Sequence, residues 1–116
     1  MGKFQDLIVW QKAKDLTVKI YKLTQQKGIS KDHGLKDQIQ RAAVSIPANI
    51  AEGDELGTDK QSVRHFYIAK GSTAELLTQL IIAQEIGYVS KNEADLLMVD
   101  CKVISTMLLK IIKARS

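Results

Sequence analysis

Apolar residues recur every three or four positions along four stretches of this chain, and polar residues fill most positions between them. In the first stretch, Asp6 to Gln26, the apolar positions advance by steps of four and three: Val9, Ala13, Leu16, Ile20 and Leu23. Because an α-helix turns about 100° per residue, this spacing places them on one face. The pattern predicts an amphipathic helix that begins at Asp6, the candidate N-cap, and ends before Gly28.

The second stretch contains the string QRAAVSIPANIAEG, Gln40 to Gly53, which is rich in small residues. Gly28 to Gly34 reads as a loop, and a helix from there to Gly53 would carry its core residues at helical spacing: Leu35, Ile39, Ala42, Ala43, Ile46 and Ile50. Pro47 cannot donate a backbone hydrogen bond to the Ala43 carbonyl, and its ring crowds that group. We therefore expect a kink just before Pro47.

Two capping boxes open the remaining helices. Thr58 with Gln61 and Ser90 with Glu93 have the required spacing, in which the hydroxyl and the longer polar side chain accept hydrogen bonds from free backbone N–H groups at the start of the helix. After a turn at Gly53 to Gly57, the third helix should reach about Ile86, and the fourth should run from Ser90 to about Ala114.

The core faces of these two helices follow from the same count. The third helix is expected to bury Val63, Phe66, Tyr67, Ala74, Leu77, Leu80 and Ile81; the fourth, Ala94, Leu97, Cys101, Ile104, Leu108 and Ile111. Gly71 lies in the middle of the third helix and costs about 1 kcal/mol relative to alanine. Close approach of another backbone would explain it.

No stretch alternates like a β-strand, and no tandem repeat or low-complexity segment is present. Four helices with three short connections predict an all-α fold, an antiparallel up-down-up-down four-helix bundle. A length of 116 residues suits one domain, so we expect residues 1–116 to form a single bundle.

The fourth helix has more apolar surface than a bundle needs. Its apolar arc spans roughly 240°, where a stripe somewhat above 100° would suffice. The third helix adds Ile68, Ile82 and Ile86 opposite its core face. Long, bent helices could cover some of this surface within one subunit, but self-association would cover it more completely. We predict a homo-oligomer whose interface includes Ile68, Ile82, Leu96, Val103 and Met107.

Composition narrows the class of protein only partly. The formal charge of +4 and pI near 9.2 permit contact with nucleic acid or acidic partners without requiring it. Cys101 is the sole cysteine, and no signal peptide is evident, so we expect a cytoplasmic protein without an intrachain disulfide. Its apolar runs fall short of the roughly 20 residues that span a bilayer, so we expect no membrane insertion.

The spacing of reactive residues predicts a protein that is not an enzyme. The histidines, His33 and His65, match neither a zinc site nor the Glu-x-x-His pairs of di-iron bundles. A Gly-rich phosphate loop is absent, as is the arginine that HEPN-type ribonucleases place four to six residues before a histidine. We expect no catalytic residue, no metal and no cofactor, and we interpret Cys101 as a small buried hydrophobe.

Two sets of polar residues remain as candidates. Asp100 lies inside the apolar arc, and a buried carboxylate needs a partner, for which Arg41 is the first choice and Lys70 the second. The expected structural or intersubunit polar network comprises Arg41, Asn49, Glu52, Glu75 and Asp100. A nucleic acid would instead meet cationic residues: Lys12, Lys19, Lys22, Arg41, Lys60, Arg64, His65 and Lys70. Any one of these lysines could equally be an ordinary solvated cation.

Three strings, in order and spacing, carry a resemblance to a known family: FQDLIVWQKA, GLKDQIQRAAVSIPANIAEG and FYIAKGSTAELLTQL. They resemble the four-helix-bundle proteins encoded in intervening sequences of bacterial 23S rRNA genes, and the accessory variability determinant of diversity-generating retroelements is similar. The resemblance covers nearly the entire chain. It implies a ring-shaped homopentamer of up-down bundles without established enzymatic activity, and a role in binding nucleic acid or a protein that handles it.

The chain also departs from that family. Relatives often carry several basic residues after the AEG, where this chain has Asp54 and Glu55, and a glutamate where Leu77 stands. The first departure weakens the RNA-binding interpretation, and the second excludes any carry-over to Leu77. Our leading hypothesis is an oligomeric bundle that binds structured RNA or DNA through repeated basic faces. The alternative is a protein-interaction scaffold for a nucleic-acid-handling partner such as a reverse transcriptase.

Overall fold

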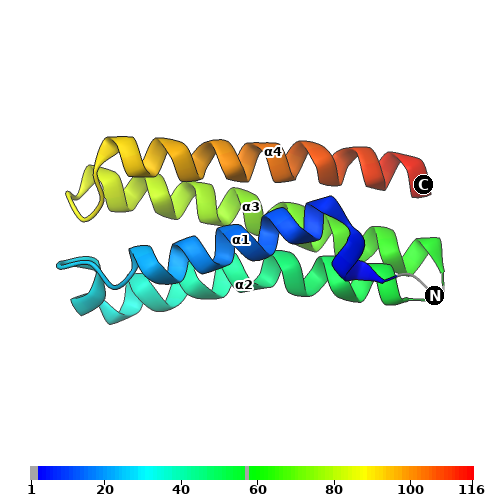
Figure 1. Cartoon of the computed structure of the whole chain (residues 1–116), viewed down its shortest axis with the longest axis horizontal. Coiled ribbons are helices and arrows are strands. Elements are labelled where there is room, and N and C mark those ends of the chain that lie inside the picture. Colours follow the sequence, from blue (N-terminus) through cyan, green and yellow to red (C-terminus); the bar gives the residue numbers. More distant parts are fainter. Residues whose placement is uncertain (1–2, 57) are drawn as a thin grey trace.

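Four long α-helices run alternately up and down in the computed structural model, which describes residues 3–56 and 58–116 (Figure 1). They are α1 (Ile8–Leu23), α2 (His33–Glu55), α3 (Asp59–Glu85) and α4 (Lys91–Arg115). Short 3₁₀ helices at Phe4–Asp6 and Ile29–Lys31 precede α1 and α2. The predicted all-α up-down bundle is confirmed, with overall extents of 43 × 20 × 20 Å.

Side chains cap the starts of α2, α3 and α4. The backbone N–H groups of Leu35, Gln61 and Glu93 donate to Asp32, Thr58 and Ser90, respectively. Both predicted capping boxes therefore mark real helix starts, while α2 begins earlier than expected because Asp32 caps it.

The prediction of Asp6 as the cap of α1 is wrong. Asp6 ends a 3₁₀ turn, and Leu7 occupies the N-cap position without a side-chain hydrogen bond. The predicted turn at Gly53 is also wrong, since α2 continues to Glu55. Gly57, the other end of that expected turn, lies outside the described residues.

The predicted core faces of α1, α2 and α4 are largely confirmed, and that of α3 is confirmed only in part: Phe66 and Leu80 are buried, and Val63 and Leu77 are half-buried. Leu35 and Ile111 are only half-buried, with Ile112 buried in place of Ile111. On α3, the expected core residues Tyr67, Ala74 and Ile81 are exposed. The buried face consists of Ser62, Phe66, Ala69, Ser72, Thr73, Leu76, Gln79, Leu80 and Ala83.

Buried hydroxyl groups explain why the observed core face of α3 differs from the predicted one. The hydroxyls of Ser62, Ser72 and Thr73 donate to the Gly53 carbonyl, the Ser45 hydroxyl and the Lys70 carbonyl, respectively. A buried polar group with a partner costs little, so small polar residues occupy positions that apolar periodicity assigns to hydrophobic ones. Apolar spacing alone therefore predicts a core face that includes the exposed residues Tyr67, Ala74 and Ile81.

Close packing of a helix backbone occurs at Gly53 and not at Gly71, where it was expected. A Cβ added to Gly71 would have no atom within 4 Å, apart from its chain neighbours and the nearby backbone of α3. The predicted close approach of another backbone to Gly71 is therefore wrong. At Gly53 a Cβ would lie 2.7 Å from Cε1 of Phe66 and 3.1 Å from the Ser62 carbonyl oxygen. Gly53 is therefore the residue that allows α2 and α3 to approach closely.

Pro47 is accommodated inside an uninterrupted α2. Its missing N–H leaves the buried Ala43 carbonyl without its normal donor. The hydroxyl of Thr17 on α1 lies 3.0 Å from that carbonyl oxygen and 2.8 Å from the Ala13 carbonyl oxygen of its own helix. Thr17 thus offers from a neighbouring helix the hydrogen bond that the proline cannot provide.

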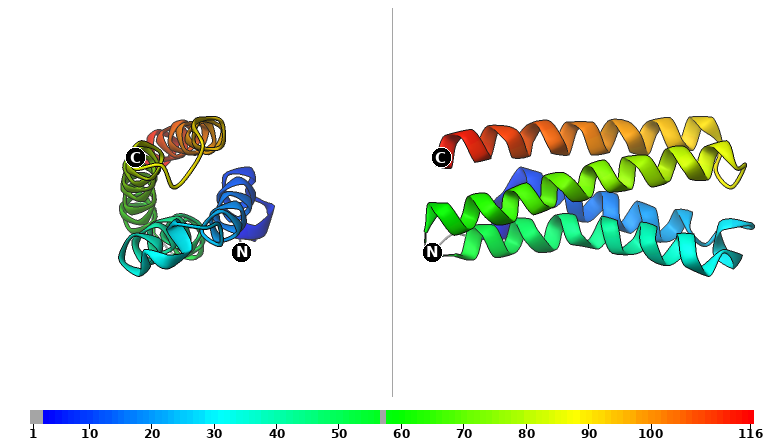
Figure 2. Two further views of the ribbon diagram at one scale, coloured as in Figure 1. Left: turned by 90° about the vertical axis from the view of Figure 1, so that its left-hand side faces the viewer. Right: turned by 180° about the vertical axis from the view of Figure 1, so that it is seen from behind.

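The end-on view in Figure 2 shows the helices following one another around an open square, with α1 and α4 at its two ends. Contact between α1 and α4 is the least extensive among neighbouring helices, and α2 with α3 the most extensive. None of the helices in the described part of the chain combines the length and hydrophobicity needed to cross a bilayer.

Candidate functional site

A groove follows the open side of the bundle between α1 and α4. Its larger part has a volume of about 360 Å³, and an adjoining part has about 160 Å³. Three of the predicted nucleic-acid-binding residues, Lys12, Lys19 and Lys22, line it along α1. Apolar side chains of α4 face them, including Leu96 and Val103.

The groove is balanced in charge. Asp15, Glu93 and Asp100 line it together with the three lysines. Lys19 Nζ lies 3.1 Å from Asp100 Oδ2, and Glu93 accepts a hydrogen bond from Gln26 at 2.8 Å. Lys14 holds the pKa of the Asp15 carboxyl below its ordinary value through a hydrogen bond. Phosphate groups would compete with carboxylates here, so the groove alone is a weak anion site.

The residues of the predicted polar network do not form one cluster within the subunit. Arg41 is exposed and pairs with Asp37 at 3.2 Å, whereas Asp100 pairs with Lys19 across the groove. Glu75 is exposed on α3. Only Asn49 and Glu52 meet, and they do so around His65, which was predicted as a nucleic-acid contact.

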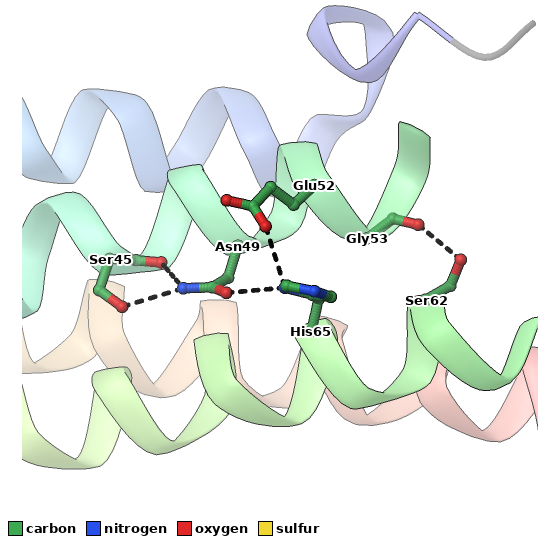
Figure 3. A network of polar contacts seen from close by, with 6 residues as sticks. All are labelled: Ser45, Asn49, Glu52, Gly53, Ser62 and His65. Carbon is green, nitrogen blue, oxygen red and sulfur yellow. Dashed lines mark hydrogen bonds and ion pairs between the residues drawn. The ribbon is translucent and has the colours of Figure 1, made fainter. Parts of the chain in front are cut away.

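Figure 3 shows this cluster between α2 and α3. Asn49 Nδ2 donates to the carbonyl and hydroxyl oxygens of Ser45, so Asn49 Oδ1 is free to accept from His65 Nδ1 at 3.0 Å. Glu52 Oε2 lies 3.5 Å from the same nitrogen. The contacts of Asn49 and Glu52 with His65 join α2 to α3.

No catalytic group is assembled in the described residues. His65 is engaged by Asn49 and Glu52, and the nearby serine hydroxyls donate to other groups. Burial, with a contribution from the Asp100 charge, raises the pKa of the Cys101 thiol to about 12, so it is a poor nucleophile. Across residues 3–56 and 58–116, no three His, Cys, Asp or Glu side chains cluster to hold a metal ion.

Positive charge gathers instead on two helix segments. Residues 60–74 of α3 and 101–116, which contain the end of α4, hold seven of the 17 basic residues and none of the 13 acidic ones, a formal charge of +7. The remaining chain has ten basic and 13 acidic residues, a formal charge of −3. Asp59 and Glu75 bound the first segment. The excess charge of the protein therefore comes from these two segments.

The fold brings the two segments together. In Figures 1 and 2, α3 and α4 run antiparallel and side by side, and the Arg115 guanidinium lies 5.0 Å from the centre of the Phe66 ring. This contact places the end of α4 beside the first half of α3. Among the described residues, Arg115 is the one cation of the seven that forms an ion pair, with Asp54 at 3.1 Å.

Each segment presents one exposed stripe at helical spacing. On α3 the stripe consists of Lys60, Arg64, Tyr67, Gly71 and Ala74; on α4, of Lys102, Thr106, Leu109 and Lys113. Lys70 is half-buried, and its helical angle places it toward α4. We refer to Lys60, Arg64, Lys70, Lys102 and Lys113 as the α3–α4 basic face.

Sequence reasoning found only the α3 half of this face. The cations Lys60, Arg64 and Lys70 were predicted, whereas Lys102 and Lys113 were not, because the apolar residues around them dominate the pattern of α4. The available signal was the run from Cys101 to Ser116 without a single acidic residue. The Asp54 carboxylate that weakened the RNA-binding interpretation is held by Arg115, which offsets its charge.

The predicted interface residues are largely exposed. Leu96 is 63% exposed, and Ile68, Ile82 and Val103 are 41–45% exposed. Met107 is half-buried and packs against the core. Further exposed apolar residues, such as Val99 and Ile86, accompany them. The subunit thus leaves much apolar surface in contact with solvent.

These features define a class: an up-down four-helix bundle with an excess of positive charge on two adjoining helix segments. The chain belongs to the family described as 23S rRNA-intervening sequence protein, whose sequence profile matches residues 5–110. That description names no enzymatic activity.

One solved structure agrees with this assignment at the level of the fold. It is a crystal structure of a protein of unknown function from the S23 ribosomal protein family of Bacteroides thetaiotaomicron. The TM-score is 0.82 at 23% identity, covering 91% of this chain and 99% of the other. None of the curated proteins compared with the chain matches it.

Proposed function

We propose that this protein is a non-enzymatic, oligomeric bundle that binds nucleic acid through the α3–α4 basic face. The observation that carries the proposal is the segregation of charge, +7 on two adjoining helix segments against −3 on the rest of the chain. Unpaired lysines and arginines that share one surface attract phosphates and release counterions, which gives affinity that depends on salt. The family description names an intervening sequence of 23S rRNA and states no ligand, so the charge distribution carries the proposal.

Self-association would multiply the basic face. The exposed apolar residues Leu96 and Val103 border the groove of α1 and α4, where charges are already balanced, so a second copy could cover them without opposing charge. A ring-shaped homopentamer, as the family resemblance implies, would present five basic faces to one nucleic acid. Weak phosphate contacts would then add through multivalency.

The direct test is a binding titration of a labelled RNA hairpin and a DNA duplex across a range of salt concentrations. We expect the logarithm of the association constant to fall linearly with the logarithm of salt concentration. Neutralising Lys102 and Lys113 with glutamine should make this slope shallower by roughly 0.7 to 0.9 for each lost contact. The matched control neutralises Lys12 and Lys22, which line the α1–α4 groove, and should change the slope less.

Any of the following outcomes would count against the proposal. Wild-type protein could show no affinity at low salt, or affinity without salt dependence. The α1 variant could lose as much as the α4 variant, which would move the site to the groove. Binding to anionic lipid vesicles without binding to either nucleic acid would assign the basic face to another ligand. Recovery of a protein partner without nucleic acid would favour the scaffold hypothesis.

A further inference from the structure

Tyr67 is an aromatic residue that the fold itself does not use. The chain has six aromatic residues. Phe4 and Trp10 pack edge to face at 5.3 Å, Phe66 lies under Arg115, and Tyr88 donates to Asp32 at 3.1 Å. The remaining two, Tyr21 and Tyr67, are 40% and 54% exposed. Of these, only Tyr67 lies between the cations of the basic face.

The surroundings of Tyr67 are cationic and open. Arg64 precedes it by one turn on the same exposed stripe, and Lys70 follows three residues later. Gly71, four residues on, has no atom near its missing Cβ, and the next stripe position is the exposed Ala74. No long side chain of this stripe covers the side of Tyr67 that faces Gly71, and the glycine there has no packing role within the subunit.

An aromatic ring among cations suits an unpaired base. Bases in a duplex are stacked on one another and present only edges and phosphates, whereas the bases of a single strand expose their flat faces. We propose that Tyr67 stacks on an unpaired base, so that the α3–α4 basic face selects single-stranded nucleic acid over duplex. This inference rests on the proposed function and specifies its ligand: the lysines and arginine hold phosphates, and the tyrosine holds a base.

The experiment compares a short labelled oligo(dT) strand with the same strand annealed to oligo(dA), by fluorescence anisotropy at fixed salt. Tyr67→Ala should weaken binding of the single strand by about 5- to 150-fold and leave duplex binding within about twofold. Tyr67→Phe should bind both as the wild type does, because it keeps the ring, whereas Tyr67→Leu should behave like Tyr67→Ala. Tyr21→Ala, on α1, is the matched control and should change neither affinity.

The possible results distinguish a failure of the stacking inference from a failure of the proposed function. If Tyr67→Ala binds the single strand as tightly as the wild type, or weakens both ligands equally, the stacking inference is wrong while the basic face stands. If Tyr67→Ala changes the mass of the assembly in light scattering, Tyr67 belongs to a subunit interface and the inference is also wrong. If wild-type protein binds neither ligand even at low salt, the proposed function itself fails.

Discussion

Thr17 and Pro47 show how a residue on one helix can depend on a residue of another. The proline leaves the Ala43 carbonyl without a donor, and the hydroxyl of Thr17 lies 3.0 Å from it. Ala43 is fully buried, so water cannot easily replace the missing bond. Sequence reasoning identified the orphaned carbonyl but not its partner, because the residues are 26 positions apart and only the packing of α1 against α2 joins them.

Replacing Thr17 by valine should therefore destabilise the protein by about 1 to 3 kcal/mol, the usual cost of an unsatisfied buried carbonyl. Urea unfolding followed by circular dichroism measures this change. Thr78→Val is the matched control: its hydroxyl donates to the Ala74 carbonyl on the exposed side of α3, so the loss should stay within about 0.5 kcal/mol.

A double variant separates this explanation from a simple packing effect. With Pro47→Ala in place, the new backbone N–H can donate to the Ala43 carbonyl, and Thr17→Val should then cost less than it does beside the proline. Equal costs in the two backgrounds would show that Thr17 does not compensate for Pro47.

Cys101 should make the free energy of unfolding depend on pH in the alkaline range. Its pKa is raised to about 12 in the folded state, first by burial and then by the Asp100 charge. An unfolded thiol ionises near pH 8.5. Between these values the unfolded state binds fewer protons than the native state, so stability falls as pH rises, and below pH 8.5 the thiol contributes no pH dependence.

The expected slope from this one group is at most about 1.4 kcal/mol per pH unit. Other groups also titrate at high pH, so the quantity to measure is the difference in unfolding free energy between wild type and Cys101→Ala from pH 8 upward. We expect that difference to shrink or change sign as pH rises. A difference that is independent of pH would contradict an un-ionised Cys101 in the native state.

At the scale of elements, hydrophobic spacing located all four helices and the buried faces of three. On α3 it found only part of the buried face, because Ser62, Ser72 and Thr73 are buried with hydrogen-bond partners that no spacing rule supplies. The pairing of Asp100 with Lys19 was missed for a related reason: it joins α1 to α4, and the relative level of two helices is set by packing. Capping boxes were reliable because they depend only on neighbouring residues.

Gly53 and Gly71 provide a matched test of the α2–α3 contact. Gly53→Ala would place a methyl group 2.7 Å from the Phe66 ring and 3.1 Å from the Ser62 carbonyl oxygen, and the clash should cost about 1 to 3 kcal/mol. Gly71→Ala meets open space and should stabilise α3 by up to about 1 kcal/mol. Thermal or urea unfolding should therefore give shifts of opposite sign, and similar shifts would refute the assigned close contact at Gly53.

At the scale of the whole molecule, the sequence indicated surplus apolar surface but not its distribution. Leu96 and Val103 border the α1–α4 groove, while Ile68 and Ile82 lie on α3, so more than one surface is available to a second copy. The basic face was only half predicted, because its two halves are distant in sequence and meet through the antiparallel packing of α3 and α4.

Changing Leu96 to glutamine and Val103 to threonine should convert an oligomer into folded monomers. Both side chains are substantially exposed in the subunit, so their replacement should leave its helix content unchanged. Adding a polar residue at Met107 should strengthen the effect but also lower stability, since Met107 packs against the core. Light scattering of the double variant measures the mass. An unchanged mass, or a wild type that is already monomeric, would remove these residues from any interface.

The unequal contacts of α1 with its two neighbouring helices indicate where local unfolding should begin. Because α1 packs mainly on α2 and only sparsely on α4, its separation from α4 breaks fewer interactions than opening any other side of the bundle. Local unfolding should therefore begin with the release of the Lys19–Asp100 pair and a widening between these two helices. The partly open state would expose Leu97 and Ile104 while α2, α3 and the hydroxyl bonds between them remain folded.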